Sequence, residues 1–203
     1  MNTSDTPQLT PGEYVEWLRQ QVHEKDIPSS NRSRAAAACF ALAQEHHHSI
    51  VLLSEHGLYG SAFSLLRVAF EAYVRGEWLV HGASEEELAG FLQTAKPLGL
   101  GSLIATIEQT PGFEERVLST MKKNHWRALC DYTHTGGLHV QRWQSEQAVE
   151  ASYTSAEIAE VVNFAEVIGS VAAVALLGLA NDEAAATVVL VKFRARRHER
   201  SET

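Results

Sequence analysis

Hydrophobic residues recur at steps of three or four along most of the chain, which is the spacing of amphipathic helices. The pattern is clearest over residues 31–56 and 114–134, and again from 154 to 180. In the first of these segments the residues at such steps are Ala35, Cys39, Leu42, His46, Ile50 and Leu53. No two segments combine strand-like alternation with the tight turn of a β-hairpin. The pattern therefore predicts an all-α protein.

One segment, residues 61–81, is hydrophobic on nearly every side of the helical wheel. A helix of this kind is surrounded by other helices, so we expect it at the centre of a bundle. Helix starts are marked by capping boxes, in which a Ser or Thr is followed three residues later by Glu. Such boxes occur at residues 10–13, 84–87 and 154–157.

The expected helices belong to one domain. We predict a single-domain bundle of five to seven helices over residues 11–198, preceded by a disordered N-terminus at 1–10 and followed by a C-terminal tail at 199–203. A chain of 203 residues buries enough surface to fold without a metal or a disulfide. The two cysteines, Cys39 and Cys130, lie in apolar helical patterns and have no zinc-site spacing.

The net charge and the hydropathy pattern argue against two classes of binding partner, duplex DNA and membranes. The formal net charge is −8, which argues against duplex DNA because phosphate binding needs clustered Lys and Arg. The basic run at 192–200 is interpreted as a solvated helix C-terminus, where cations complement the helix dipole. The apolar run 161–180 contains Asn163, Glu166 and Ser170, which favours a core helix over a membrane span. With no signal segment at the N-terminus, we expect a cytoplasmic protein without a membrane partner.

The segment expected at the centre of the bundle carries a ladder of charges. Arg67, Glu71 and Arg75 are spaced four residues apart, so successive members differ by about 40° around the helix. An unpaired charge in a core is costly, so these groups must pair with one another or face a polar cavity. They are candidate binding residues, and a self-satisfied ladder that fixes helix register is the alternative.

A second group of polar residues lies near the end of the helix expected over 114–134. Arg127, Asp131 and His134 share one face, because they are separated by four and then three residues. Asp131 is placed to orient the imidazole of His134, and Arg127 to stabilise charge on a phosphorane. We predict these three as catalytic residues and Tyr132 as a binding residue. An ordinary surface ladder, with His134 complementing the helix dipole, is the alternative.

A metal site is the third candidate. Glu45 and His48 have the Glu-x-x-His spacing of carboxylate-bridged di-iron bundles, which need two such motifs and two further Glu residues. The sequence contains one motif. We therefore predict no metal and no cofactor, with Glu45 and His48 as weak ligand candidates.

Two motifs carry a family resemblance. The helix with Leu-Arg-x-x-x-Glu at 66–71 and the later Tyr-Thr-His-Thr-Gly at 132–136 resemble a group of uncharacterised bacterial all-α proteins. More loosely, the chain resembles the HEPN superfamily of helical bundles, which often carries an Arg-x(4–6)-His motif. Arg127 and His134 fit this spacing, and Arg75 and His81 fit it as well.

The HEPN resemblance implies a function and an assembly. Many members are dimeric ribonucleases of toxin–antitoxin or phage-defence systems, so it implies a homodimer and a metal-independent endoribonuclease with RNA or an antitoxin-type protein as partner. A non-catalytic module that binds RNA or a protein is the first alternative. A metal-binding bundle of the four-helix type is the second. Whether the protein is an enzyme stays open at this point.

Overall fold

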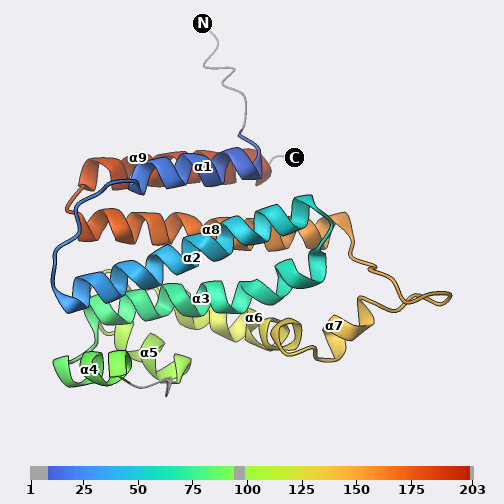
Figure 1. Cartoon of the computed structure of the whole chain (residues 1–203), viewed down its shortest axis with the longest axis horizontal. Coiled ribbons are helices and arrows are strands. Elements are labelled where there is room, and N and C mark those ends of the chain that lie inside the picture. The colour runs from blue at the N-terminus through green and yellow to red at the C-terminus, as the bar shows by residue number, and fades with distance from the viewer. Residues whose placement is uncertain (1–8, 94–98, 202–203) are drawn as a thin grey trace, which may run out of the picture.

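The computed structural model describes residues 9–93 and 99–201, and these form helices and connecting loops without a strand (Figure 1). The predicted all-α, single-domain bundle is confirmed. The helices are α1 (Pro11–Val22), α2 (Asn31–Glu55), α3 (Tyr59–His81), α4 (Glu85–Gln93), α5 (Leu100–Ile107), α6 (Val117–Thr133), α7 (Gly137–Gln141), α8 (Ser155–Leu179) and α9 (Glu183–Ser201).

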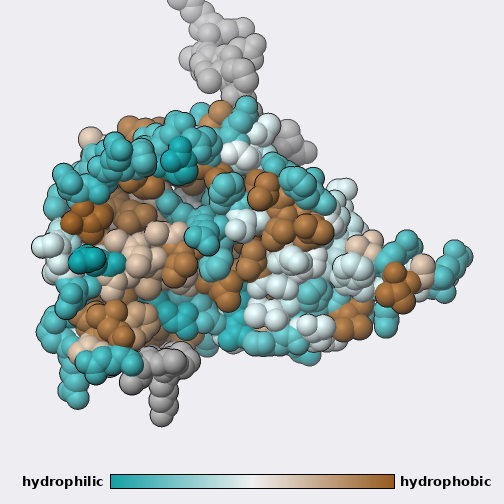
Figure 2. All heavy atoms as spheres, viewed as in Figure 1, coloured by the Kyte–Doolittle hydropathy of each residue, from teal (hydrophilic) through white to brown (hydrophobic). Residues whose placement is uncertain are grey.

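The helices lie in layers. In Figure 1, α1 and α9 cover one side, α2 and α8 follow, then α3 and α6, and α4 and α5 close the opposite side. Helix α3 packs against α2, α5, α6 and α8, as its hydrophobic circumference predicted. Hydrophobic residues on the face drawn in Figure 2 form separate patches among hydrophilic ones.

The described residues contain nine helices, more than the five to seven expected, because several are short. Helix α7 has five residues and lies outside the helical segments identified in the sequence. A segment of less than two turns holds too little periodicity to predict. All three capping boxes form, with Thr10, Ser84 and Thr154 each accepting the backbone N–H three residues on.

Helix α2 buries a different face from the one predicted. Leu42, expected in the core, is 48% exposed. The buried residues of α2 are Ala36, Cys39, Phe40, Ala43, His47, Ile50 and Val51. Helix α2 packs against both α3 and α8, so its buried face is wider than one stripe and is centred differently.

Helix α8 is the one helix of the described residues that is long and apolar enough to cross a membrane. Half of its most apolar stretch is buried inside the protein, where α8 packs against α1, α2, α3 and α9. Core helices of soluble proteins and membrane spans share this length and composition, so α8 alone does not indicate a membrane protein.

The interpretation of residues 192–200 as a solvated helix end is wrong at Arg196. This side chain is 3% exposed, and its Nε donates to Glu166 Oε1 of α8 at 2.7 Å. Its Nη1 also donates to the carbonyl of Leu9, and its guanidinium lies 4.7 Å from the centre of the Tyr14 ring. Arg196 therefore joins α9 to α8 and to the start of α1.

The predicted chain ends fall largely outside the described residues. Of the expected disordered segment 1–10, the structure describes Leu9 and Thr10, and Thr10 caps α1. At the other end, α9 continues to Ser201, inside the expected tail at 199–203.

Loss of Arg196 should destabilise the whole bundle. We expect Arg196→Ala to lower the free energy of unfolding by about 3–5 kcal/mol, because it removes the buried ion pair with Glu166. Urea denaturation measures the effect. Arg194→Ala, at an exposed position on the same helix, is the control and should change stability by no more than about 0.5 kcal/mol. Equal effects of the two substitutions would contradict the role given to Arg196.

Candidate functional site

The charged ladder of α3 is closed through one shared carboxylate. Arg67 Nε donates to Glu71 Oε1 at 2.8 Å, and Arg75 Nη2 donates to Glu71 Oε2 at 2.7 Å. Burial raises the pKa of Glu71, but the hydrogen bonds and charges of Arg75 and Arg67 outweigh burial and hold that pKa below its ordinary value. Glu71 is thus a fixed anion, and the three groups together keep one positive charge.

Arg67 reaches from this ladder to α6. Its Nη1 contacts Nε2 of His134, and its guanidinium carbon lies 4.7 Å from the centre of the Trp126 ring. His134 is the C-cap of α6, so its side chain leaves the helix at the turn toward α7. Two residues that the sequence placed in separate groups, Arg67 and His134, therefore lie in contact.

Asp131 does not orient His134 in this structure. Its Oδ2 accepts the backbone N–H of Leu138 at 3.1 Å, at the start of α7. The chain reverses between the two helices at Thr135, whose φ is 55°, and at Gly136, where a β-carbon would collide with the Asp131 carboxylate. Asp131 therefore holds the α6–α7 turn, and its predicted catalytic role lacks the contact it requires.

Arg127 is not beside His134 either. Seven residues along one helix correspond to a rise of about 10 Å. Arg127 is exposed and lines a hollow of about 650 Å³ that opens between α5 and α6. The other lining residues are Gly101, Ile104, Ser119, Lys122, Lys123 and Trp126. The arginine next to His134 is Arg67.

Lys122, Lys123 and Trp126 are functional candidates that the sequence reasoning missed. Lys122 Nζ lies 5.9 Å from the centre of the Trp126 ring, which also has Arg67 close by. The signal was present as Lys-Lys-x-x-Trp-Arg at 122–127, because residues three and four apart share a helix face. Helix α6 carries three Lys or Arg and one Asp in a chain whose net charge is −8.

Tyr132 lies on another face of α6, away from Arg67. It is 9% exposed, and its ring meets Phe63 edge-on with centres 4.9 Å apart. Burial raises the pKa of its hydroxyl. The backbone carbonyl of Tyr132 accepts from Ser64 and His139, so the residue anchors α6 to α3 and α7. Tyr132 thus has a structural position, and the binding role predicted for it stays a prediction.

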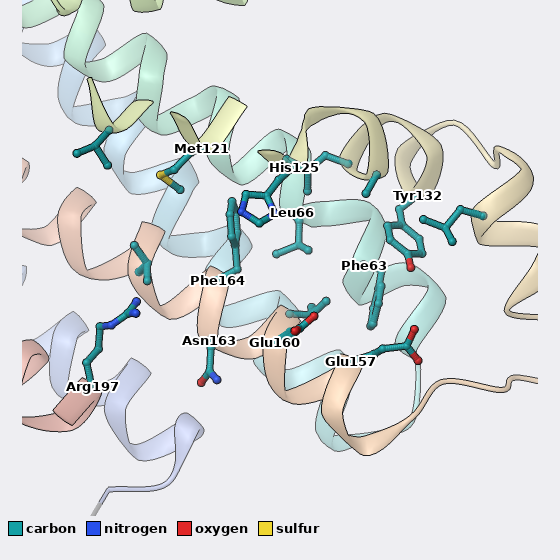
Figure 3. A pocket seen from close by; sticks show the side chains of 16 residues that line it. Phe63, Leu66, Met121, His125, Tyr132, Glu157, Glu160, Asn163, Phe164 and Arg197 are labelled. Atoms are coloured by element: carbon teal, nitrogen blue, oxygen red, sulfur yellow. The ribbon is translucent and has the colours of Figure 1, made fainter. Parts of the chain in front are cut away.

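Tyr132 also lines a groove of about 610 Å³ between α6 and α8 (Figure 3). Hydrophobic side chains make up most of its walls, and Phe164 meets His125 edge-on across it, with ring centres 5.6 Å apart. Glu157 and Arg197 lie toward opposite ends. Neither Arg67 nor His134 lines this groove, so it is separate from their contact.

The histidine run 46–48 gives no metal cluster within the described part of the chain, where no three metal-binding side chains converge. Glu45 and His48 are both exposed and border a hollow of about 240 Å³ beside α1. His47 is instead buried, and its ring lies against Gly169 of α8, where a β-carbon would collide with it. The residues fit a surface and a helix contact better than a di-iron site.

Burial of His47 should make the protein sensitive to acid. Burial, together with the nearby His48 and Arg196, lowers the pKa of His47 from 6.5 to about 3. The unfolded chain therefore takes up a proton below pH 6.5 that the folded protein excludes until about pH 3. As the pH is lowered through this window, we expect the free energy of unfolding to fall by up to about 1.4 kcal/mol per pH unit.

Urea denaturation at several pH values tests this expectation. His47→Leu should flatten the pH dependence, and His23→Gln, at an exposed position, should leave it unchanged. An unaltered slope in His47→Leu would show that another group is responsible.

Fold and site together define an all-α bundle protein with a cationic, tryptophan-bearing helix face. The model of a family of unknown function, DUF6988, matches residues 40–196. The match spans more than half of the chain, so the protein belongs to this family. It includes α3, α6 and α8 and ends at Arg196. No curated protein and no solved structure matches the chain.

Proposed function

We propose that the protein binds single-stranded RNA through the α3–α6 face formed by Arg67, Lys122, Lys123, Trp126 and Arg127. The observation that carries the proposal is the position of the Trp126 ring among these cations, beside an open hollow. Proteins that bind single strands combine a positive groove for the phosphates with aromatic rings for the bases. This face offers both groups within two helices.

The local charge supports an anionic partner. Phosphate binding is driven by Lys and Arg that displace counterions from the nucleic acid. The net charge of −8 repels nucleic acid from most of the protein, so the cations of α6 would select one face for the encounter. A partly buried ring favours unstacked bases over a duplex, whose bases are inaccessible to it.

The contact between Arg67 and His134 adds donors to this face. A guanidinium only donates, so Nε2 of His134 must accept and Nδ1 must carry the hydrogen. The remaining donors of Arg67 and Nδ1 of His134 are then available to phosphate oxygens. In this arrangement the imidazole has no free lone pair, so the geometry favours binding over proton abstraction.

A metal-independent endoribonuclease, as the HEPN resemblance implies, is the second candidate. The specific observation in its favour is that an arginine and a histidine are in contact at an exposed position, which is a pairing suited to phosphodiester chemistry. Its arginine would be Arg67 instead of Arg127. His134 would need to release Arg67 before acting as a base.

Removing the cations of α6 should weaken RNA binding. We expect the triple variant Lys122→Gln, Lys123→Gln, Arg127→Gln to lower the affinity for a labelled single-stranded oligonucleotide at least tenfold. Affinity falls as salt rises, and each lost phosphate contact makes the slope of log affinity against log salt less negative by about 0.7. Three lost contacts therefore make it less negative by about 2. Fluorescence anisotropy over a range of salt concentrations measures both quantities.

The control for this variant removes equal charge elsewhere. Arg34→Gln, Lys192→Gln, Arg194→Gln changes cations on α2 and α9 and should alter affinity much less. A separate variant, Trp126→Leu, should lose about tenfold in affinity with an unchanged salt slope, because stacking is not electrostatic. Absence of binding by the native protein, or equal losses in the two triple variants, would refute the proposal.

Cleavage assays separate binding from catalysis. If the second candidate holds, the native protein cleaves RNA in the presence of EDTA, and His134→Ala abolishes cleavage while leaving RNA affinity within a few fold. RNA that is bound but stays intact would leave binding as the function and eliminate the ribonuclease.

A further inference from the structure

Another cavity, of about 440 Å³, lies between α3, the C-terminal half of α8 and Leu190 of α9. Its walls are mainly hydrophobic, with Val171 and Val174 from α8 and Leu190 from α9. The exceptions are Glu77 and His81 of α3. A hydrophobic cavity with one or two polar groups is the usual form of a small-molecule site.

Glu77 is the unusual feature of this cavity. It is 6% exposed, and among the described residues its ion-pair partner is His81, whose Nε2 lies 3.3 Å from Oε2. An imidazole is a conditional cation, unlike the two arginines that hold Glu71. The buried carboxylate therefore has no permanent positive charge beside it, although burying an uncompensated charge is strongly unfavourable.

Aromatic rings line the same cavity as this carboxylate. Phe40 and Tyr73 line the cavity with ring centres 6.2 Å apart, and Phe113 meets His81 edge-on with centres 5.4 Å apart. Phe40 can lie against α3 because residue 76 is Gly, where a β-carbon would collide with the ring. Burial, and then the charge of Glu77 and a hydrogen bond with it, raise the pKa of Tyr73, so its ring stays neutral.

We propose that this cavity binds a small organic ammonium ion. The faces of aromatic rings attract cations. The Glu77 carboxylate supplies the negative charge that a cationic ligand needs, and the ligand supplies a permanent positive charge beside the carboxylate. A divalent metal fits poorly, because the walls offer it one carboxylate and one imidazole where it prefers several ligands. A neutral ligand would leave Glu77 with His81 as its conditional cation.

The ammonium site is independent of the RNA-binding face. Glu71 and Glu77 are six residues apart, which places them about 120° apart around α3. The hollow beside Trp126 and the cavity at Glu77 share no lining residue: the first is bounded by α5 and α6, the second by α3, α8 and α9. The ammonium proposal therefore stands or falls separately from the proposed RNA binding.

The experiment is an NMR titration of the intact protein with choline and with benzyltrimethylammonium. The neutral control is 3,3-dimethyl-1-butanol, which has the shape of choline with carbon in place of nitrogen. We expect saturable binding of at least one cation, with shifts of resonances from Tyr73 and Phe113. The neutral alcohol should bind at least tenfold more weakly than choline if choline is the cation that binds.

Two substitutions test the residues. Glu77→Gln keeps the side-chain shape and should weaken the cation at least tenfold without changing the affinity for the alcohol. Phe113→Leu, at a half-buried position in the loop before α6, should weaken the cation severalfold and keeps the proposal testable if Glu77→Gln does not fold. Glu160→Gln, an exposed carboxylate on α8, is the matched control and should have no effect.

The outcomes decide the proposal. Binding of neither cation in the millimolar range would overturn it. Equal affinity for choline and the alcohol, or equal effects of Glu77→Gln and Glu160→Gln, would overturn it as well, since cation recognition by Glu77 would then be absent.

Discussion

The polar face of this protein depends on one carboxylate shared by two arginines. Glu71 holds Arg67 and Arg75 on a helix that packs against four others and has little room for unpaired charge. Because Glu71 fixes Arg67, the guanidinium is available at a defined position to Trp126 and His134 of α6. The charged ladder is therefore a structural pairing that also supports the exposed cationic face. The sequence raised these as two alternatives, a self-satisfied ladder and a set of binding residues, and the two are compatible.

The carboxylates of Glu71, Glu77 and Glu166 differ in how their charge is compensated. Glu166 has Arg196, and Glu71 has two arginines, so both are neutralised by permanent cations. Within residues 9–93 and 99–201, the group that can pair its charge with Glu77 is the imidazole of His81. Breaking a buried ion pair of the first kind is strongly destabilising, so these pairs hold the helices together. The carboxylate of the second kind is the one to which we assign a charged ligand. The two proposals thus assign a polyanion to one surface of this fold and a small cation to a separate cavity.

Features that depend on residues a few positions apart were predicted correctly from the sequence, whereas contacts between distant segments were not. Helix starts, the central position of α3 and the pairing of Glu71 follow from residues three or four positions apart. The turn at Thr135 redirects Asp131 to α7, and no helical wheel contains that turn. Arg196 finds its partner 30 residues away on another helix, and the cavity at Glu77 exists only once α8 and α9 are in place. Predicting these required the tertiary arrangement itself.

The central claim is that nucleic acid engages the cationic face of α6. The chain has four tryptophans, and Trp126 is the one on this face, so the indole N–H resonances form an internal comparison with Trp17, Trp78 and Trp143. In an NMR titration with a short single-stranded RNA, the account predicts that the Trp126 indole signal and the amides of α6 shift first and saturate together. Saturable shifts confined to other tryptophans and other helices would contradict it.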